Sequence, residues 1–222
     1  ISMISIHDTS DISLDHVTLR RNSIFDDMLH VIYASGVSVI NSNFENAMSD
    51  AVDVDMSSIR FSNVTFRASG NDGLDLMSSN AIVEDARFLG SGDKGVSVGE
   101  ASTVFIRKSE FRENVIGLEA KDGSRAALVD SRLMENKKHF NAYKKNWRYG
   151  GGGKIIADRL ILGGGGEGVT ADKHSDIDIR NTGAASKSGS GSSPVPRSDQ
   201  YPADIQSILQ ELDTLTRGRT TP

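Results

Sequence analysis

The sequence contains no cysteine, only four prolines, and aromatic side chains at just 6% of its 222 residues. Without cysteine, the chain can form neither a disulfide framework nor a thiolate-ligated metal site. No apolar run approaches the ~18 residues of a membrane-spanning helix, so we expect no membrane span. The net charge of −5 disfavours general affinity for phosphate backbones, and we expect no nucleic-acid partner.

Glycine, in contrast, is abundant, with 22 copies, while the apolar content is 37%. This balance favours many tight turns around a thin core of small aliphatic side chains. The chain begins at Ile1, without Met, inside a β-like run. We therefore expect a fragment truncated at its N-terminus, with any targeting signal outside the sequence.

One pattern recurs about every 22 residues: a buried position is followed three and five residues later by two more. The copies are Leu14, Val17, Leu19; Val39, Ser42, Phe44; Phe61, Val64, Phe66; Val83, Ala86, Phe88; Ile106, Ser109, Phe111; Leu128, Ser131, Leu133; and Ala157, Leu160, Leu162, with Ile179 beginning an incomplete eighth. Alternation with period two indicates strands with one buried face. Such short repeats leave no room for helices, so successive strands must stack in parallel ~4.8 Å apart. The pattern predicts an all-β fold, a right-handed parallel β-helix of about eight coils over residues 1–183.

The second half of each coil holds another strand, as in Val52 and Val54. Asn22, Asn114 and Asn136 each follow a reference position by eight residues. Because asparagine tolerates left-handed backbone, we expect these three residues to form turn corners.

Stacking the second strands predicts three outward columns of side chains. The central column is His30, Asp53, Asp75, Ser97, Glu119, Asn141 and Thr170; the entrance column is Asp27, Asp50, Asp72, Lys94, Ile116 and Lys138; the exit column is Asp55, Met77, Gly99, Lys121 and Tyr143. Stacked carboxylates repel one another. Three interpretations stay open: hydrogen bonds to turn backbone, a raised carboxyl pKa for catalysis, or a Ca²⁺ ion held by Asp50, Asp53, Asp72 and Asp75.

A catalytic interpretation needs a cation to neutralise a sugar carboxylate and a base to remove a proton. The candidate catalytic residues are Asp75, Lys94, Glu119, Lys121 and Tyr143. If this set is an enzyme site, it resembles that of a polysaccharide lyase or epimerase. The alternative is that the two lysines pair with neighbouring aspartates and close turns.

The sixth interval between repeats is 29 residues long, and its excess lies in residues 143–153. This segment carries the only Trp, and aromatic faces and cations suit an acidic sugar polymer. The candidate substrate-binding residues are Asp53, Lys144, Trp147, Arg148 and Tyr149. The alternative is a packed surface loop. The glycine-rich run 163–168 is a candidate second wall of the same site.

The repeat ends near residue 183. Residues 184–198 form a Gly/Ser/Pro-rich linker, and residues 199–222 form a tail with a predicted amphipathic helix over 203–217. Its apolar stripe, the candidate partner-binding residues, is Ile205, Ile208, Leu209, Leu212 and Leu215. Such a short helix needs a surface, so we expect it either to cap or otherwise dock on its own solenoid, or to dock on a partner protein.

Several coil segments resemble a known family. They are "SDAVDVDMSS", "GNDGLDLMSSN", "GDKGVSVGEAS", "EAKDGS" and "NAYKKNWRYGGG". Together they resemble, over residues 26–180, the right-handed β-helix domains of bacterial envelope proteins, some attached to CotH-like domains, within the pectate-lyase-like superfold. This resemblance implies a carbohydrate ligand and a secreted, periplasmic or cell-surface location.

The function favoured at this stage is binding or modification of an acidic polysaccharide, with Ca²⁺ as the candidate cofactor. The sequence lacks the paired Asp and Gly-His-Gly pattern of polygalacturonases and the Asp-Pro-His-Asp pattern of alginate epimerases. One alternative is a non-catalytic scaffold whose C-terminal helix docks on a partner protein. A third interpretation is one subunit of a trimeric fibre.

Overall fold

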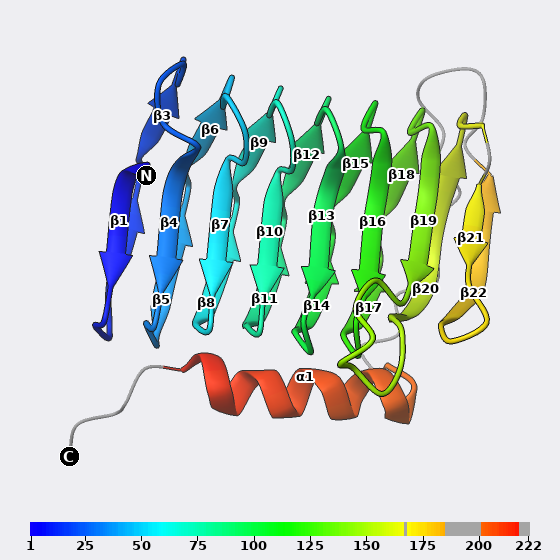
Figure 1. The fold of residues 1–222 in the computed structure, drawn as a ribbon. Helices are drawn as coiled ribbons and strands as arrows, with labels where there is room; N and C mark the ends of the chain where they lie inside the picture. The colour runs from blue at the N-terminus through cyan, green and yellow to red at the C-terminus, as the bar shows by residue number, and fades with distance from the viewer. Residues whose placement is uncertain (167, 185–200, 218–222) are drawn as a thin grey trace.

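The computed structural model describes residues 1–166, 168–184 and 201–217, which form a parallel β-solenoid with one helix along its side (Figure 1). Each complete coil contributes one strand to an eight-stranded sheet and two strands to a 14-stranded sheet. The predicted parallel solenoid of about eight coils is confirmed. Among the described residues, no helix is long and apolar enough to cross a membrane.

The eight-stranded sheet contains, in spatial order, β1 (Ser2–His7), β4 (Asp27–Ile32), β7 (Val52–Asp55), β10 (Leu74–Met77), β13 (Lys94–Gly99), β16 (Ile116–Lys121), β19 (Lys138–Tyr143) and β21 (Val169–Ala171). The 14-stranded sheet consists of two rows. The first row contains β2 (Ser13–Asp15), β5 (Val37–Ile40), β8 (Ser58–Ser62), β11 (Asn80–Glu84), β14 (Thr103–Arg107) and β17 (Arg125–Val129). The second row contains β3 (Thr18–Arg20), β6 (Asn43–Glu45), β9 (Thr65–Arg67), β12 (Arg87–Leu89), β15 (Glu110–Arg112) and β18 (Arg132–Met134). The longer strands β20 (Lys154–Gly163) and β22 (Asp176–Ala184) run through both rows and join them.

The core is the inside of the solenoid, filled by the repeat positions that the sequence identifies. Phe66, Phe88 and Phe111 are fully buried. Their rings are stacked, with centroids 4.7 Å apart for the first pair and 4.8 Å for the second. These separations match the spacing of paired strands, so identical side chains one coil apart meet face to face and stabilise the stack.

The predicted asparagine corners are wrong in their backbone conformation. The left-handed φ falls on the residue before each asparagine: Arg21 (58°), Glu113 (58°) and Glu135 (57°). The Asn114 and Asn136 side chains point inward and are buried. The Asn114 amide donates to the Phe88 carbonyl at 3.0 Å and to Asn136 Oδ1 at 2.9 Å. A buried amide ladder between coils therefore outweighs the preference of asparagine for left-handed backbone.

The helix α1 (Ala203–Thr216) lies against the outside of the first row and contacts β8, β11 and β14 (Figure 1). It follows the side of the solenoid and does not cover the C-terminal coil, so the expectation of an end cap is wrong. The physical reason is that the outward apolar side chains that can pack against the helix lie on the side of the solenoid, on the first row. Beyond Ala184, the predicted linker lies outside the described residues.

Candidate functional site on the eight-stranded sheet

The strand register of the eight-stranded sheet places the outward columns as the sequence predicts. His30 pairs with Asp53, Asp53 with Asp75, and Asp75 with Ser97. The column continues through Glu119 to Asn141. Because a register shift of one residue would turn all of these side chains inward, the buried valines and leucines between them fix the polar face.

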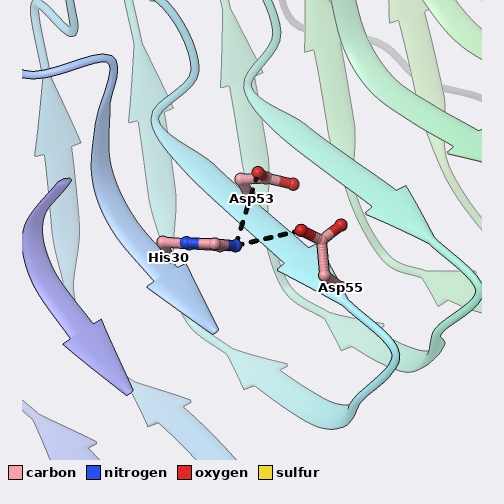
Figure 2. Close-up of side chains that lie close together, drawn as sticks. All are labelled: His30, Asp53 and Asp55. Carbon is pink, nitrogen blue, oxygen red and sulfur yellow. Dashed lines mark hydrogen bonds and ion pairs between the residues drawn. The ribbon is translucent and has the colours of Figure 1, made fainter. Parts of the chain in front are cut away.

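A histidine and two aspartates on this face form a group of three potential metal ligands (Figure 2). His30 Nε2 lies 3.0 Å from Asp55 Oδ2 and 3.7 Å from Asp53 Oδ2. One potential ligand atom from each of the three lies within 4.8 Å of the others. One imidazole and two carboxylates form a donor set that divalent transition metals accept. The sequence contained a signal for this group, since His30 is the only histidine in the outward columns and Asp55 follows Asp53 by two residues.

Crowding of carboxylates perturbs the acidity of this group. Burial, together with the charges of Asp55 and Asp75, raises the pKa of Asp53 to about 8. Burial and the charge of Asp50 raise the pKa of Asp27 to about 6. Near neutral pH, therefore, the Asp53 carboxyl can hold or release a proton, with the His30 ring as its neighbour.

The predicted Ca²⁺ ligands do not converge, because two of them bind backbone instead. Asp50 Oδ1 accepts hydrogen bonds from the Asp72 backbone N–H at 2.7 Å and from the Asn71 side chain at 2.8 Å. Asp72 Oδ1 accepts the Lys94 N–H at 2.9 Å. Among the described residues, only His30, Asp53 and Asp55 form a group of three ligands as tight as 4.8 Å. The entrance carboxylates thus link the turns of successive coils.

The five candidate catalytic residues occupy one face, and three of them, Lys94, Glu119 and Tyr143, interact electrostatically with one another. Lys94 Nζ lies 3.6 Å from Asp72 Oδ1 and also pairs with Asp93. Although burial lowers the pKa of the Lys94 amine, these carboxylates raise it above its usual value on balance. Burial and the nearby Glu119 carboxylate raise the pKa of Tyr143 to about 12. Both shifts oppose the role of a general base at neutral pH.

The other three members of the catalytic set lie beside these residues. Asp75 is paired in register with Asp53. Glu119 is buried and accepts a 2.7 Å hydrogen bond from the Asn141 amide. Lys121 is also buried, and its amine donates to Ser97 Oγ at 3.0 Å. The C-terminal half of the face is therefore a largely buried polar network in which Glu119 Oε1 accepts no hydrogen bond, whereas the His30 group is partly open to solvent.

The loop 143–153 leaves the sheet at the exit end of β19 (Figure 1). Asp122 Oδ1 anchors it by accepting the backbone N–H groups of Lys145 and Asn146, each at 2.7 Å. Beyond this anchor, Trp147 is 83% exposed, and the Arg148 guanidinium carbon lies 5.9 Å from its ring centroid.

The other loop candidates, Lys144 and Tyr149, lie on either side of Trp147 and Arg148 in the sequence. The Lys144 N–H donates to Asp172 Oδ2 at 3.0 Å. The Tyr149 ring lies next to Gly123. The loop is thus a fixed base that carries an exposed basic and aromatic tip.

The glycine-rich run 163–168 borders a hollow at the entrance end of β16 and β19. Gly165 and Gly166, together with Ile116 and Lys137, line this open hollow of about 640 Å³. The hollow lies on the side of the sheet opposite the loop 143–153. Gly165 and Gly166 therefore border a hollow that does not include Trp147, so the predicted second wall of the Trp147 site does not form there.

The candidate partner-binding residues of the tail pack against the solenoid of the same chain. Ile205, Ile208 and Leu212 are buried in a cluster with outward side chains of the first row. Leu209 packs at its margin, and Leu215 is 46% exposed. Of the two alternatives for this helix, the structure places it on its own solenoid.

A stack of parallel coils with three strand rows defines the class of parallel β-solenoids. The family model described as "Right handed beta helix region" matches residues 27–184, and the chain belongs to this family. No curated protein matches the sequence significantly. Among solved structures, the chain is similar to QnrB1, a plasmid-mediated fluoroquinolone resistance protein, with 11% identity and a TM-score of 0.19, covering 80% of this chain and 91% of that one.

Proposed function

We propose that the chain is a carbohydrate-binding β-helix of a bacterial envelope or secreted system that holds an acidic polysaccharide. The observation that carries this proposal is the exposed Trp147, with Arg148 over its ring, on an anchored loop beside the polar sheet face. An exposed aromatic ring with cations beside it suits an acidic sugar polymer, because the ring can stack on a sugar and the cations attract its carboxylates. Lys144 and Lys145 supply two more positive charges in the same loop.

The charges of the sheet face favour one position for the polymer. The acidic side chains are concentrated on β4, β7 and β10, whereas the cationic loop follows β19. A polyanion is repelled by the first group and attracted by the second. We propose that it binds at the C-terminal coils, and that Ca²⁺ extends its contact toward the aspartates by bridging carboxylates of protein and polymer.

The proposal favours binding over chemical turnover. Lys94 and Tyr143 both have raised pKa values, and Lys121 is buried against Ser97. A base that removes a sugar proton near neutral pH needs the opposite shift and access to substrate. The scaffold alternative is supported by hydrogen bonds between coils, such as that from Lys121 to Ser97, because they make the coils rigid.

The test is affinity electrophoresis and calorimetry with polygalacturonate and alginate, each with Ca²⁺ or with EDTA, and with dextran as the neutral polymer. Trp147→Ala is expected to weaken binding about tenfold, ~1.4 kcal/mol. The matched control is Tyr33→Ala, since Tyr33 is 52% exposed but lies at the distant end of β4. Equal binding by wild type and Trp147→Ala, or equal affinity for dextran, would overturn the proposal. New absorbance from unsaturated sugars would instead establish a lyase.

A further inference from the structure

The outward face of the first row carries a contiguous cluster of buried apolar side chains. Ile82, Phe105, Ala127 and Ile156 come from β11, β14, β17 and β20 and are paired in register, which makes them one column. Val129 lies in the same buried cluster. We call this surface, with the arginines described below, the helix groove. Soluble proteins rarely leave such a strip uncovered.

The spacing of the coils suits a helix that runs along the stack. An α-helix advances ~5.4 Å per turn, and paired strands are ~4.8 Å apart. A helix parallel to the solenoid axis therefore places about one turn over each coil. Ile205, Ile208 and Leu212 follow this rule and are buried in the helix groove.

Charges on the two partners are complementary. Arg60 donates to Asp213 at 2.5 Å, Arg125 to Glu211 at 2.8 Å, and Arg180 to Asp204 at 2.8 Å. The three arginines come from β8, β17 and β22, so basic side chains lie along the length of the helix groove. The Arg159 guanidinium also lies 4.9 Å from the ring centroid of Tyr201. The ligand that this surface recognises is an amphipathic helix with acidic flanks.

α1 occupies the helix groove although its own ends are poorly capped. Its N-cap is Pro202, with no side-chain cap hydrogen bond, and its last turn has no basic residue. Both features leave a short helix unstable on its own. Leu215, at the end of its apolar stripe, stays 46% exposed. Besides its apolar contacts and ion pairs, α1 has a high effective concentration at the helix groove because it belongs to the same chain.

We propose that the helix groove is a binding site for an acidic amphipathic helix of a partner protein, and that α1 is its intramolecular competitor. A partner helix with better caps and a longer apolar stripe displaces α1, and the released tail leaves the coils intact. This site lies on a different sheet from the proposed polysaccharide site, so each proposal can fail without the other.

The test uses the full chain and a fluorescein-labelled peptide of residues 201–217, capped at both ends, with binding measured by fluorescence anisotropy. The opened variant Ile208→Asp/Leu212→Asp removes two groove contacts of the internal helix. The matched control Ser207→Asp/Gln210→Asp adds the same charge on the exposed side of α1. A second peptide carries Asp204→Lys, Glu211→Lys and Asp213→Lys.

The opened variant is expected to bind the acidic peptide at least about tenfold more tightly than wild type or control, because internal occupancy lowers apparent affinity. The lysine peptide is expected to bind it at least about tenfold more weakly. No binding to the opened variant, or equal binding of the two peptides, would overturn the proposal.

Amide hydrogen exchange on the wild type keeps the test decisive if the opened variant fails to fold. The α1 amides are expected to exchange at least about tenfold faster than those of β11 and β14, since α1 opens separately from the coils. Equal rates would show that α1 is an inseparable part of the fold and contradict the proposal. A wild-type dimer with exchanged α1 helices would also contradict it, because a second copy would then be the occupant.

Discussion

Two outward faces of this solenoid are formed by the same coils but differ in chemistry, one being acidic and the other apolar. On β7 and β10 the outward positions include partly exposed aspartates, whereas on β11 and β14 they include Ile82 and Phe105 under a helix. The inward positions between them are alike, small or aliphatic on both faces. Inward residues therefore determine the fold, and outward residues decide independently on each face what that face contacts.

Breaking the inward stack should have the largest effect, because both faces depend on it. Phe88→Ala leaves a cavity between Phe66 and Phe111, whose rings lie 4.7 and 4.8 Å from that of Phe88. We expect a loss of about 3–5 kcal/mol in the free energy of unfolding, measured by urea denaturation. A loss below that of an exposed substitution such as Tyr33→Ala would contradict this role for the stack.

Breaking the covered outward face should have a smaller and local effect. Leu212 is fully buried against the first row, so Leu212→Ala is expected to weaken docking of α1 by about 2–3 kcal/mol. The reason is lost burial without damage to the coils. Amide exchange should then accelerate in α1 and stay unchanged in β11. Accelerated exchange in both elements would mean that helix and coils unfold together.

The acidic outward face should show its effect through pH. The pKa of Asp53 is about 8 in the folded chain against an ordinary value of 3.8, so the folded state binds its proton more tightly. This contribution is present at low pH and is lost as pH rises from about 4 to 8.

Asp53→Asn removes that pH dependence without changing the shape of the side chain. We expect it to stabilise the chain by about 1–3 kcal/mol at pH 8 and by little at pH 4, as measured by denaturation at both values. The matched control is Asp85→Asn, since Asp85 lies on an exposed turn. An equal gain at both pH values would rule out a raised pKa.

The exposed loop should contribute least to stability. Trp147 is 83% exposed, so Trp147→Ala is expected to change the free energy of unfolding by less than about 0.5 kcal/mol. The same substitution is expected to weaken polysaccharide binding, which would separate ligand contact from folding. A thermal scan of the variant checks this expectation, and a large loss of stability would indicate a packed loop.

The strand architecture was predictable because each coil repeats the same inward spacing. That spacing placed Asp53 over Asp75 and located all three outward columns correctly. It also contained the apolar column of Ile82 and Phe105, whose outward position follows from the same alternation. What period alone could not show is that α1 would bind there, since docking depends on side chains that are distant in the sequence.

Side-chain conformation was the least predictable part of the candidate site. For Asp50 and Asp72 the sequence left three interpretations open, and each accepts a backbone N–H from the next coil, as the backbone hydrogen-bond interpretation predicts. His30 was assigned to the correct column, but its contact with Asp55 depends on ring orientation across the strand. Register follows from periodicity, whereas partner choice among several nearby polar groups depends on angles that the sequence does not encode locally.

The ion pairs of α1 extend from Arg60 on β8 to Arg180 on β22. Repeat proteins ordinarily tolerate the gain or loss of a whole repeat, since each unit contacts only its neighbours. Here the helix has a fixed length, so inserting or deleting a coil between β8 and β22 would shift one end by ~4.8 Å relative to the other. The fixed length of α1 therefore restricts how the number of coils beneath it can change in evolution.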